Sequence, residues 1–172
     1  TPPKRPAGQE KRNPLTPLER ERGWSGLAFT FYVGFLRYLS QQSFGTIDCP
    51  VYAVPLDWRQ DLGSLGMYTA KRLRTHLEAH PAKPKHFVII THSQGGLVAR
   101  RMLQGFPELA EKTLGVIHGV QPADGAPVLY RRLFTGAVSK YDGGWGFSKI
   151  LGDTPAKFRA IASVLPGAMQ LL

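Results

Sequence analysis

The residues best suited to covalent chemistry lie at positions 91–96, which read Thr-His-Ser-Gln-Gly-Gly. An apolar run at 86–90 precedes the serine, and an amphipathic stretch at 94–104 follows it. A serine at a sharp turn between a strand and a helix presents its hydroxyl to the first N–H groups and the positive dipole end of that helix. This pattern predicts that Ser93 is a nucleophile and that the backbone N–H of Gln94 stabilises an oxyanion.

The apex of such a turn is strained, so the residues two positions before and after the serine are expected to be small. These residues are Thr91 and Gly95, and Gly96 gives the helix room to pack close to the strand. Thr91 stands where the usual Gly-x-Ser-x-Gly motif has a glycine, and threonine is the bulkier residue. The alternative is an ordinary strand–turn–helix junction that contains a serine by chance.

A serine nucleophile also needs a histidine base and an acid that orients this base. In the fold for which such a serine turn is typical, the chain order is serine, acid, histidine. His118 is the only histidine after Ser93, but it falls within a predicted strand, where packing or a hydrogen bond is the simpler role. Asp124 is a candidate acid, although Asp-Gly is also an ordinary turn dipeptide. We therefore expect the catalytic histidine to lie outside these residues.

Several further elements are needed to position the serine turn. Apolar runs at 49–56, 86–90 and 113–120 predict strands, and the second is typical of a central parallel strand that is covered on both faces. Helical patterns are found at 64–80 and 94–104. Strands that alternate with helices predict a parallel sheet with right-handed crossovers.

An earlier helix is predicted from Gly26 to a point before Gly45. Its apolar residues recur every four positions, and its aromatic side chains are expected in the core. The residues of this stripe are Leu27, Phe31, Phe35 and Leu39, with Leu36 beside them.

The run from Phe87 to Arg100 resembles the serine turn of α/β-hydrolase lipases of the lecithin:cholesterol acyltransferase and GPI inositol-deacylase type. Residues 57–59, Asp-Trp-Arg, resemble the first of these groups. Residues 116–127 are similar to a strand and turn of bacterial relatives, which include phospholipase effectors of type VI secretion. The resemblance covers roughly residues 50–130. It implies an α/β-hydrolase parallel sheet with flanking helices, incomplete at both ends here, and a serine lipase, esterase or phospholipase without metal or cofactor.

Three regions are expected along the chain. Residues 1–25 form a basic, proline-rich tail or loop, residues 26–130 form the hydrolase core, and residues 131–172 form a lid-like or cap segment that continues further. A fragment of a longer hydrolase is favoured over an intact scaffold that has lost its triad, because the first residue is Thr1. Such a scaffold without a triad would be a non-catalytic interaction module.

The charge balance is basic, with 22 Lys and Arg against 12 Asp and Glu and a net charge of +10. Part of the excess crowds the first two dozen residues, which indicates a solvated segment, and contact with a membrane surface is the second interpretation. Nucleic acid is disfavoured, because no nucleic-acid fold signature accompanies the charge. Cys49 is the single cysteine and excludes an internal disulfide. For the location of the protein, the sequence is consistent both with the bacterial cytoplasm and with secretion or delivery as an effector.

Overall fold

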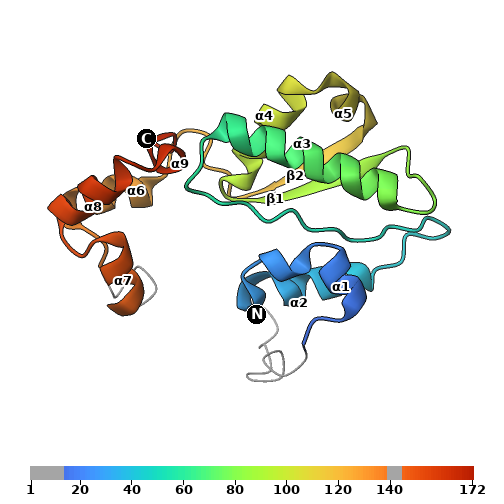
Figure 1. The fold of residues 1–172 in the computed structure, drawn as a ribbon, viewed down its shortest axis with the longest axis horizontal. Coiled ribbons are helices and arrows are strands. Elements are labelled where there is room, and N and C mark those ends of the chain that lie inside the picture. The colour runs from blue at the N-terminus through green and yellow to red at the C-terminus, as the bar shows by residue number, and fades with distance from the viewer. Residues whose placement is uncertain (1–13, 139–144) are drawn as a thin grey trace. The chain divides into compact units, whose positions relative to one another are not determined.

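The computed structural model describes residues 14–138 and 145–172, and the chain divides into two compact units, Thr1–Pro55 and Leu56–Leu172 (Figure 1). The first unit contains α1 (Pro17–Glu21), a 3-10 helix η2 (Trp24–Gly26) and α2 (Phe29–Ser40). The start of α1 is a capping box, in which the Thr16 hydroxyl accepts from the Glu19 N–H and the Glu19 carboxylate accepts from the Thr16 N–H. The helices α1 and η2 lie where the sequence predicts a tail or loop.

The predicted apolar face of α2 is wrong for its aromatic residues, whereas Leu36, which is predicted beside the stripe, is buried. Val33 and Leu36 are its buried residues, whereas Phe31 is 81% exposed and Phe35 is also exposed. Leu36 packs in a core cluster with Trp24 and Ala53, so the contacts of η2 and the extended segment select the buried face of the helix. The stripe with a spacing of four identifies the helix but not the side that packs.

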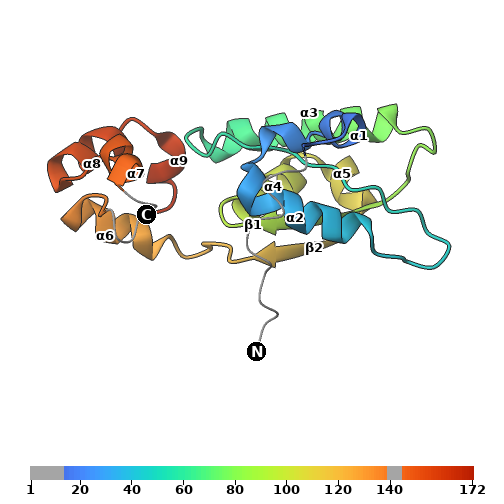
Figure 2. The same ribbon diagram turned by 90° about the horizontal axis from the view of Figure 1, so that it is seen from below.

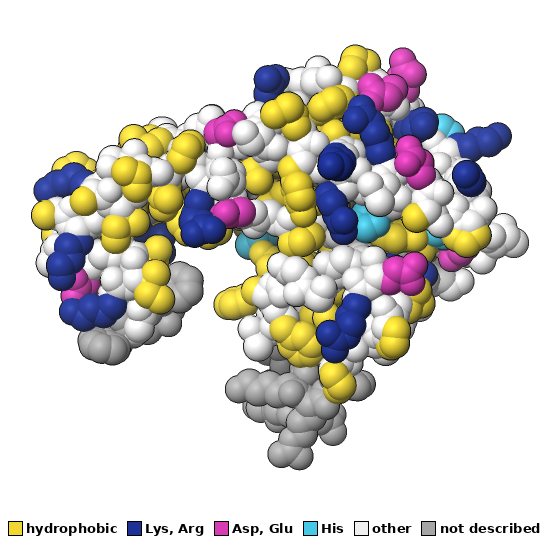
Figure 3. Space-filling model, in the orientation of Figure 1, with side chains coloured by type: hydrophobic (Ala, Val, Ile, Leu, Met, Phe, Trp, Pro, Cys, Tyr) yellow, Lys and Arg dark blue, Asp and Glu magenta, His cyan; other side chains and the backbone are white. Residues whose placement is uncertain are grey.

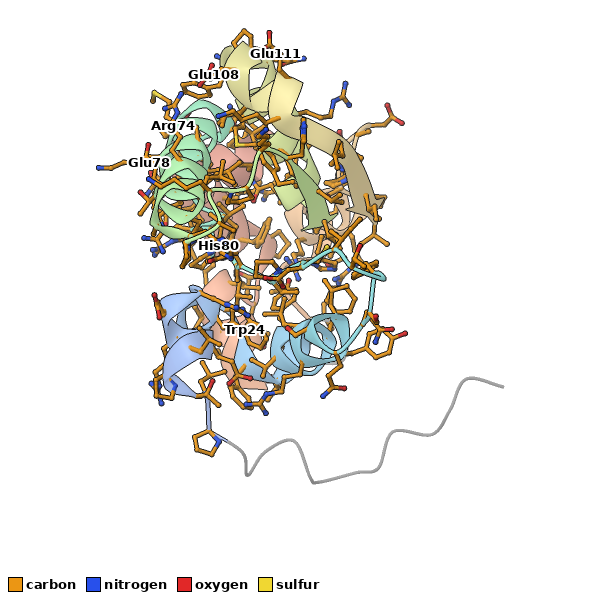
Figure 4. The ribbon with its side chains drawn as sticks, turned by 90° about the vertical axis from the view of Figure 1, so that its right-hand side faces the viewer. Trp24, Arg74, Glu78, His80, Glu108 and Glu111 are labelled. Atoms are coloured by element: carbon orange, nitrogen blue, oxygen red, sulfur yellow. The ribbon has the colours of Figure 1, made fainter. Side chains whose placement is uncertain are left out.

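The strand predicted at 49–56 is also wrong, because this segment has no ladder partner in the structure. Its backbone groups are satisfied in another way. The Ala53 N–H donates to the Arg22 carbonyl at 2.8 Å, and the indole N–H of Trp24 (labelled in Figure 4) donates to the Val51 carbonyl at 3.0 Å. The two prolines in the run lack the N–H that a ladder requires, so an extended segment pinned by the first helices replaces the strand.

The second unit begins with a helix-and-strand layer that contains the serine turn. In chain order its elements are α3 (Leu62–Ala79), β1 (Phe87–His92), α4 (Gly95–Gly105), α5 (Pro107–Lys112) and β2 (Thr113–Gly119). The two strands are parallel, with Ile89 opposite Val116 and His92 opposite Gly119. Figures 1 and 2 show α3, α4 and α5 on the same side of the two strands. The sequence predicts each of these strands and both longer helices to within a few residues.

The helices α3, α4 and α5 of the second unit cover one face of this sheet. Phe87 and Ile89 pack against a core cluster from the three helices, which contains Ala70, Met102 and Leu109. On the other face Val88 and Ile90 of β1 and Ile117 of β2 are exposed. The prediction of a strand covered on both faces is therefore wrong for this structure, in which burial alternates along β1.

An ion pair joins the helices of the covered face. The Arg74 guanidinium on α3 pairs with the Glu108 carboxylate on α5, and both are labelled in Figure 4. The Arg74 guanidinium also lies 4.8 Å from the centre of the Phe106 ring. The Arg74 side chain therefore bridges α3 to the segment between α4 and β2.

The remaining helices of the second unit are short. They are α6 (Pro127–Thr135), α7 (Trp145–Leu151), α8 (Pro155–Ala162) and α9 (Pro166–Met169). A cluster of buried side chains unites them, and it consists of Leu129, Ala137, Leu151, Phe158, Ala162 and Ala168. Prolines at the start of α6, α8 and α9 explain the repeated breaks. Within residues 14–138 and 145–172 no helix is long and apolar enough to cross a membrane.

Candidate active site

Ser93 lies between the end of β1 and the start of α4, at the apex of the turn that the sequence predicts. Its φ is +53°, in the left-handed region that residues other than glycine rarely adopt. The Ser93 N–H donates to the Gly119 carbonyl at 2.8 Å, and the Gly96 N–H donates to the Ser93 carbonyl at 3.0 Å. A non-glycine residue in the left-handed conformation costs about 1–3 kcal/mol of folding free energy, and residues with such strain cluster at functional sites.

The start of α4 supplies N–H groups next to Ser93. Gln94 is the N-cap residue and Gly95 is the first residue of the helix. The first N–H groups of a helix have no acceptor within it, and together with the helix dipole they favour a negative charge at this end. The predicted oxyanion donor, the Gln94 N–H, therefore lies at the chemically suitable end of α4, directly after the serine.

Of the two glycines after Gln94, the steric demand falls on Gly96 and not on Gly95. A Cβ on Gly95 would lie 3.9 Å from the Thr91 Cβ and 4.0 Å from the Leu56 Cδ1, which are ordinary contacts. A Cβ on Gly96 would lie 2.8–2.9 Å from the side chain of Gln121. Gly96 therefore allows the loop after β2 to pack against the first turn of α4.

The side chain of Gln94 has a role that the sequence does not reveal. It is buried, and its Nε2 donates to the Gly167 carbonyl in α9 at 3.0 Å. The Gly167 N–H in turn donates to the Arg59 carbonyl at 3.0 Å. The Leu62 N–H donates to the Gln170 side chain at 2.8 Å. The serine turn, the loop before α3 and α9 are thus joined into one hydrogen-bonded group.

Gly167 has no space for a side chain. A Cβ there would lie 2.1 Å from the Trp58 carbonyl oxygen and 2.5 Å from the Gln60 carbonyl oxygen. Both atoms belong to the backbone, so a rotamer change cannot remove the overlap. The close approach of α9 to the loop at residues 57–61 depends on this glycine.

Asp57 and Arg59 form a bidentate ion pair on the same loop. The Arg59 Nε lies 2.7 Å from one Asp57 carboxylate oxygen, and a terminal guanidinium nitrogen lies 2.8 Å from the other. The hydrogen bonds from Arg59 lower the pKa of Asp57 to about 2. Asp57 is therefore a carboxylate at neutral pH and its two oxygens are occupied by arginine.

His118 and Asp124 are not brought into a triad with Ser93. The His118 Nδ1 lies 3.0 Å from the Thr91 hydroxyl, which also donates to the Ile117 carbonyl at 3.3 Å. This cross-strand contact fixes the imidazole on β2. Asp124 is exposed in a turn after β2. No hydrogen bond connects these three described residues, so the base and acid that a serine hydrolase requires are not assembled by them.

Metal chemistry has no obvious centre in the part of the chain that the structure describes. No group of three or more His, Cys, Asp or Glu side chains there is placed to hold a metal ion. The single cysteine, Cys49, is exposed.

Comparisons with known proteins extend this picture. No known protein family and no curated protein matches the sequence. The structure is similar to a chain in the solved Tle4–Tli4 complex, with a TM-score of 0.54 and 27% sequence identity. The match covers 72% of this chain and 24% of that chain, so this chain spans about a quarter of the length of the protein it matches.

Proposed function

We propose that this chain carries the nucleophile of a lipase or esterase of the α/β-hydrolase type, which cleaves carboxylic esters through an acyl-enzyme on Ser93. The single observation that carries the proposal is the left-handed backbone of Ser93 between a parallel strand and a helix. The similarity to the Tle4–Tli4 structure supports it, since Tle4 is a lipase effector of the α/β-hydrolase type. The resemblance of residues 87–100 to lipase serine turns points the same way.

The reaction follows the two-step course of serine hydrolases. The Ser93 oxygen attacks the ester carbonyl carbon and transfers its proton to a base, and the negative oxygen that forms faces the N–H groups at the start of α4. The carbon–oxygen bond of the ester then breaks, and the alcohol leaves with a proton. Water attacks the acyl-enzyme in the same way, releases the carboxylic acid and regenerates Ser93.

A lipid ester is the substrate class that the chain's charge favours. Its net charge is +10, and Figure 3 shows Lys and Arg side chains spread over the visible face. Positive charge of this kind concentrates a protein at an anionic phospholipid surface. A phospholipid or another lipid ester at such a surface is therefore the proposed substrate, and contact with the membrane surface is part of the proposal.

A non-catalytic interaction module on a hydrolase scaffold is the second candidate. The contact between His118 and Thr91 favours this alternative. His118 is the only histidine after Ser93 in the given sequence, and this contact holds its imidazole on β2. Under this alternative the strained serine turn is a retained feature of the fold, and no ester is hydrolysed.

The test is ester turnover by the complete gene product. We expect wild-type protein to hydrolyse p-nitrophenyl esters or phospholipid vesicles, and Ser93→Ala to reduce kcat by roughly 10⁴-fold or more. Ser163→Ala, which removes an exposed serine at the end of α8, is the matched control and should retain full activity. Turnover that survives in Ser93→Ala would overturn the nucleophile assignment, and a wild-type protein without turnover would favour the interaction module.

A further inference from the structure

We propose that Val120 contacts the apolar part of the substrate and sets the preference for the acyl chain. The proposal rests on the proposed function, because it requires Ser93 to be the nucleophile. Val120 is the residue directly after β2, and it is 76% exposed.

Val120 and Ser93 are neighbours at the carboxyl edge of the sheet. His92 lies opposite Gly119 in the parallel register, and the Ser93 N–H donates to the Gly119 carbonyl. This bond belongs to the His92–Gly119 pair, the last pair of the ladder, so Ser93 and Val120 are the residues that directly follow this pair on the two strands. Adjacent strands are about 5 Å apart, which places the backbone of Val120 within the reach of an ester bound at Ser93.

The backbone of Val120 is strained as well. Its φ is +48°, a region that a β-branched residue essentially avoids and that glycine or asparagine adopts readily. Both residues at this edge, Ser93 and Val120, are therefore held in the left-handed conformation side by side.

Packing of the side chain does not explain this conformation. About three-quarters of Val120 is exposed, so the residue gains little from burial in the fold. The loop after it is held by other residues, since Gln121 lies against the start of α4 and the Ala126 N–H donates to the Leu171 carbonyl at 2.7 Å. Backbone strain of this kind clusters at active sites and ligand contacts, and here it holds an apolar side chain beside the nucleophile, where it is suited to contact an apolar ligand.

The experiment measures the ratio of kcat/KM for p-nitrophenyl octanoate to that for p-nitrophenyl acetate in the complete gene product. Val120→Gly and Val120→Asn keep the left-handed turn and remove the apolar group. We expect each to lower the ratio about tenfold, chiefly through the octanoate value, which corresponds to about 1.4 kcal/mol. Val120→Ile keeps an apolar β-branched side chain and should keep the wild-type ratio.

Lys83 provides the matched control, because it is an exposed non-glycine residue with a φ of +43° in the loop between α3 and β1. Lys83→Gly relieves the same kind of strain and should leave the ratio unchanged. An unchanged ratio in Val120→Gly and Val120→Asn would overturn the role of Val120 even where Ser93→Ala abolishes turnover. Turnover that persists in Ser93→Ala would instead overturn the proposed function, and the role of Val120 with it.

Discussion

Gly167→Ala is expected to detach α9 from the serine turn. The added Cβ would lie 2.1 Å from the Trp58 carbonyl oxygen, so the two backbone segments must move apart by roughly 1 Å. This movement breaks the bond from the Gly167 N–H to Arg59 and the bond from Gln94 Nε2 to Gly167, both 3.0 Å long. Two lost hydrogen bonds and a buried amide left without an acceptor cost about 2–4 kcal/mol of the free energy of unfolding.

Urea unfolding with linear extrapolation measures this loss, and hydrogen exchange at the Gly167 amide locates it. Gly105→Ala is the matched control, because no atom lies within 4 Å of a Cβ at that position in α4. The control should be as stable as wild type or slightly more stable, since alanine favours a helix. A Gly167→Ala protein within 0.5 kcal/mol of wild type, which is roughly the size of a neutral surface substitution, would refute the close approach of α9.

Two further predictions concern the capping box and the serine turn. The hydrogen bond from Arg37 lowers the pKa of Glu19 from 4.5 to about 2, so the carboxylate stabilises the folded state above pH 4.5 and this contribution is lost as the pH falls toward 2. Glu19→Gln should therefore speed hydrogen exchange in α1 and α2 at pH 7 and change it little near pH 2; an equal effect at both values would contradict the ion pair. Gly96→Val should lower the urea midpoint by displacing Gln121, whereas Gly95→Ala should not, and equal midpoints would refute the packing at Gly96.

Local patterns predict the elements that carry their own signal. Apolar runs predict the strands β1 and β2, and apolar residues at helical spacing predict the helices α3 and α4. Both signals lie in residues that are adjacent in the chain. The segment at 49–56 has the same apolar texture, but a strand also needs a partner, and the bonds to Arg22 and Trp24 occupy its backbone instead. The buried face of α2 likewise depends on a distant contact, since Leu36 packs on Trp24 and Ala53.

At the candidate site, too, the sequence predicts what adjacent residues determine and does not predict contacts between distant residues. The turn at Ser93 is predicted because strand, serine, glycines and helix are adjacent in the chain. The bond from Gln94 to Gly167 joins residues 73 positions apart, and a glutamine next to a serine gives no sign of it. The left-handed conformation of Val120 is hidden for another reason, because valine is among the residues least expected there.

Covalent labelling tests the central claim that Ser93 is the nucleophile. The complete gene product is treated with a p-nitrophenyl alkylphosphonate, which phosphonylates activated serines, and the modified peptide is identified by mass spectrometry. The account predicts one adduct, on the peptide that contains Ser93, and no adduct in Ser93→Ala. An adduct on another serine, or an unmodified protein that still hydrolyses esters, would contradict it.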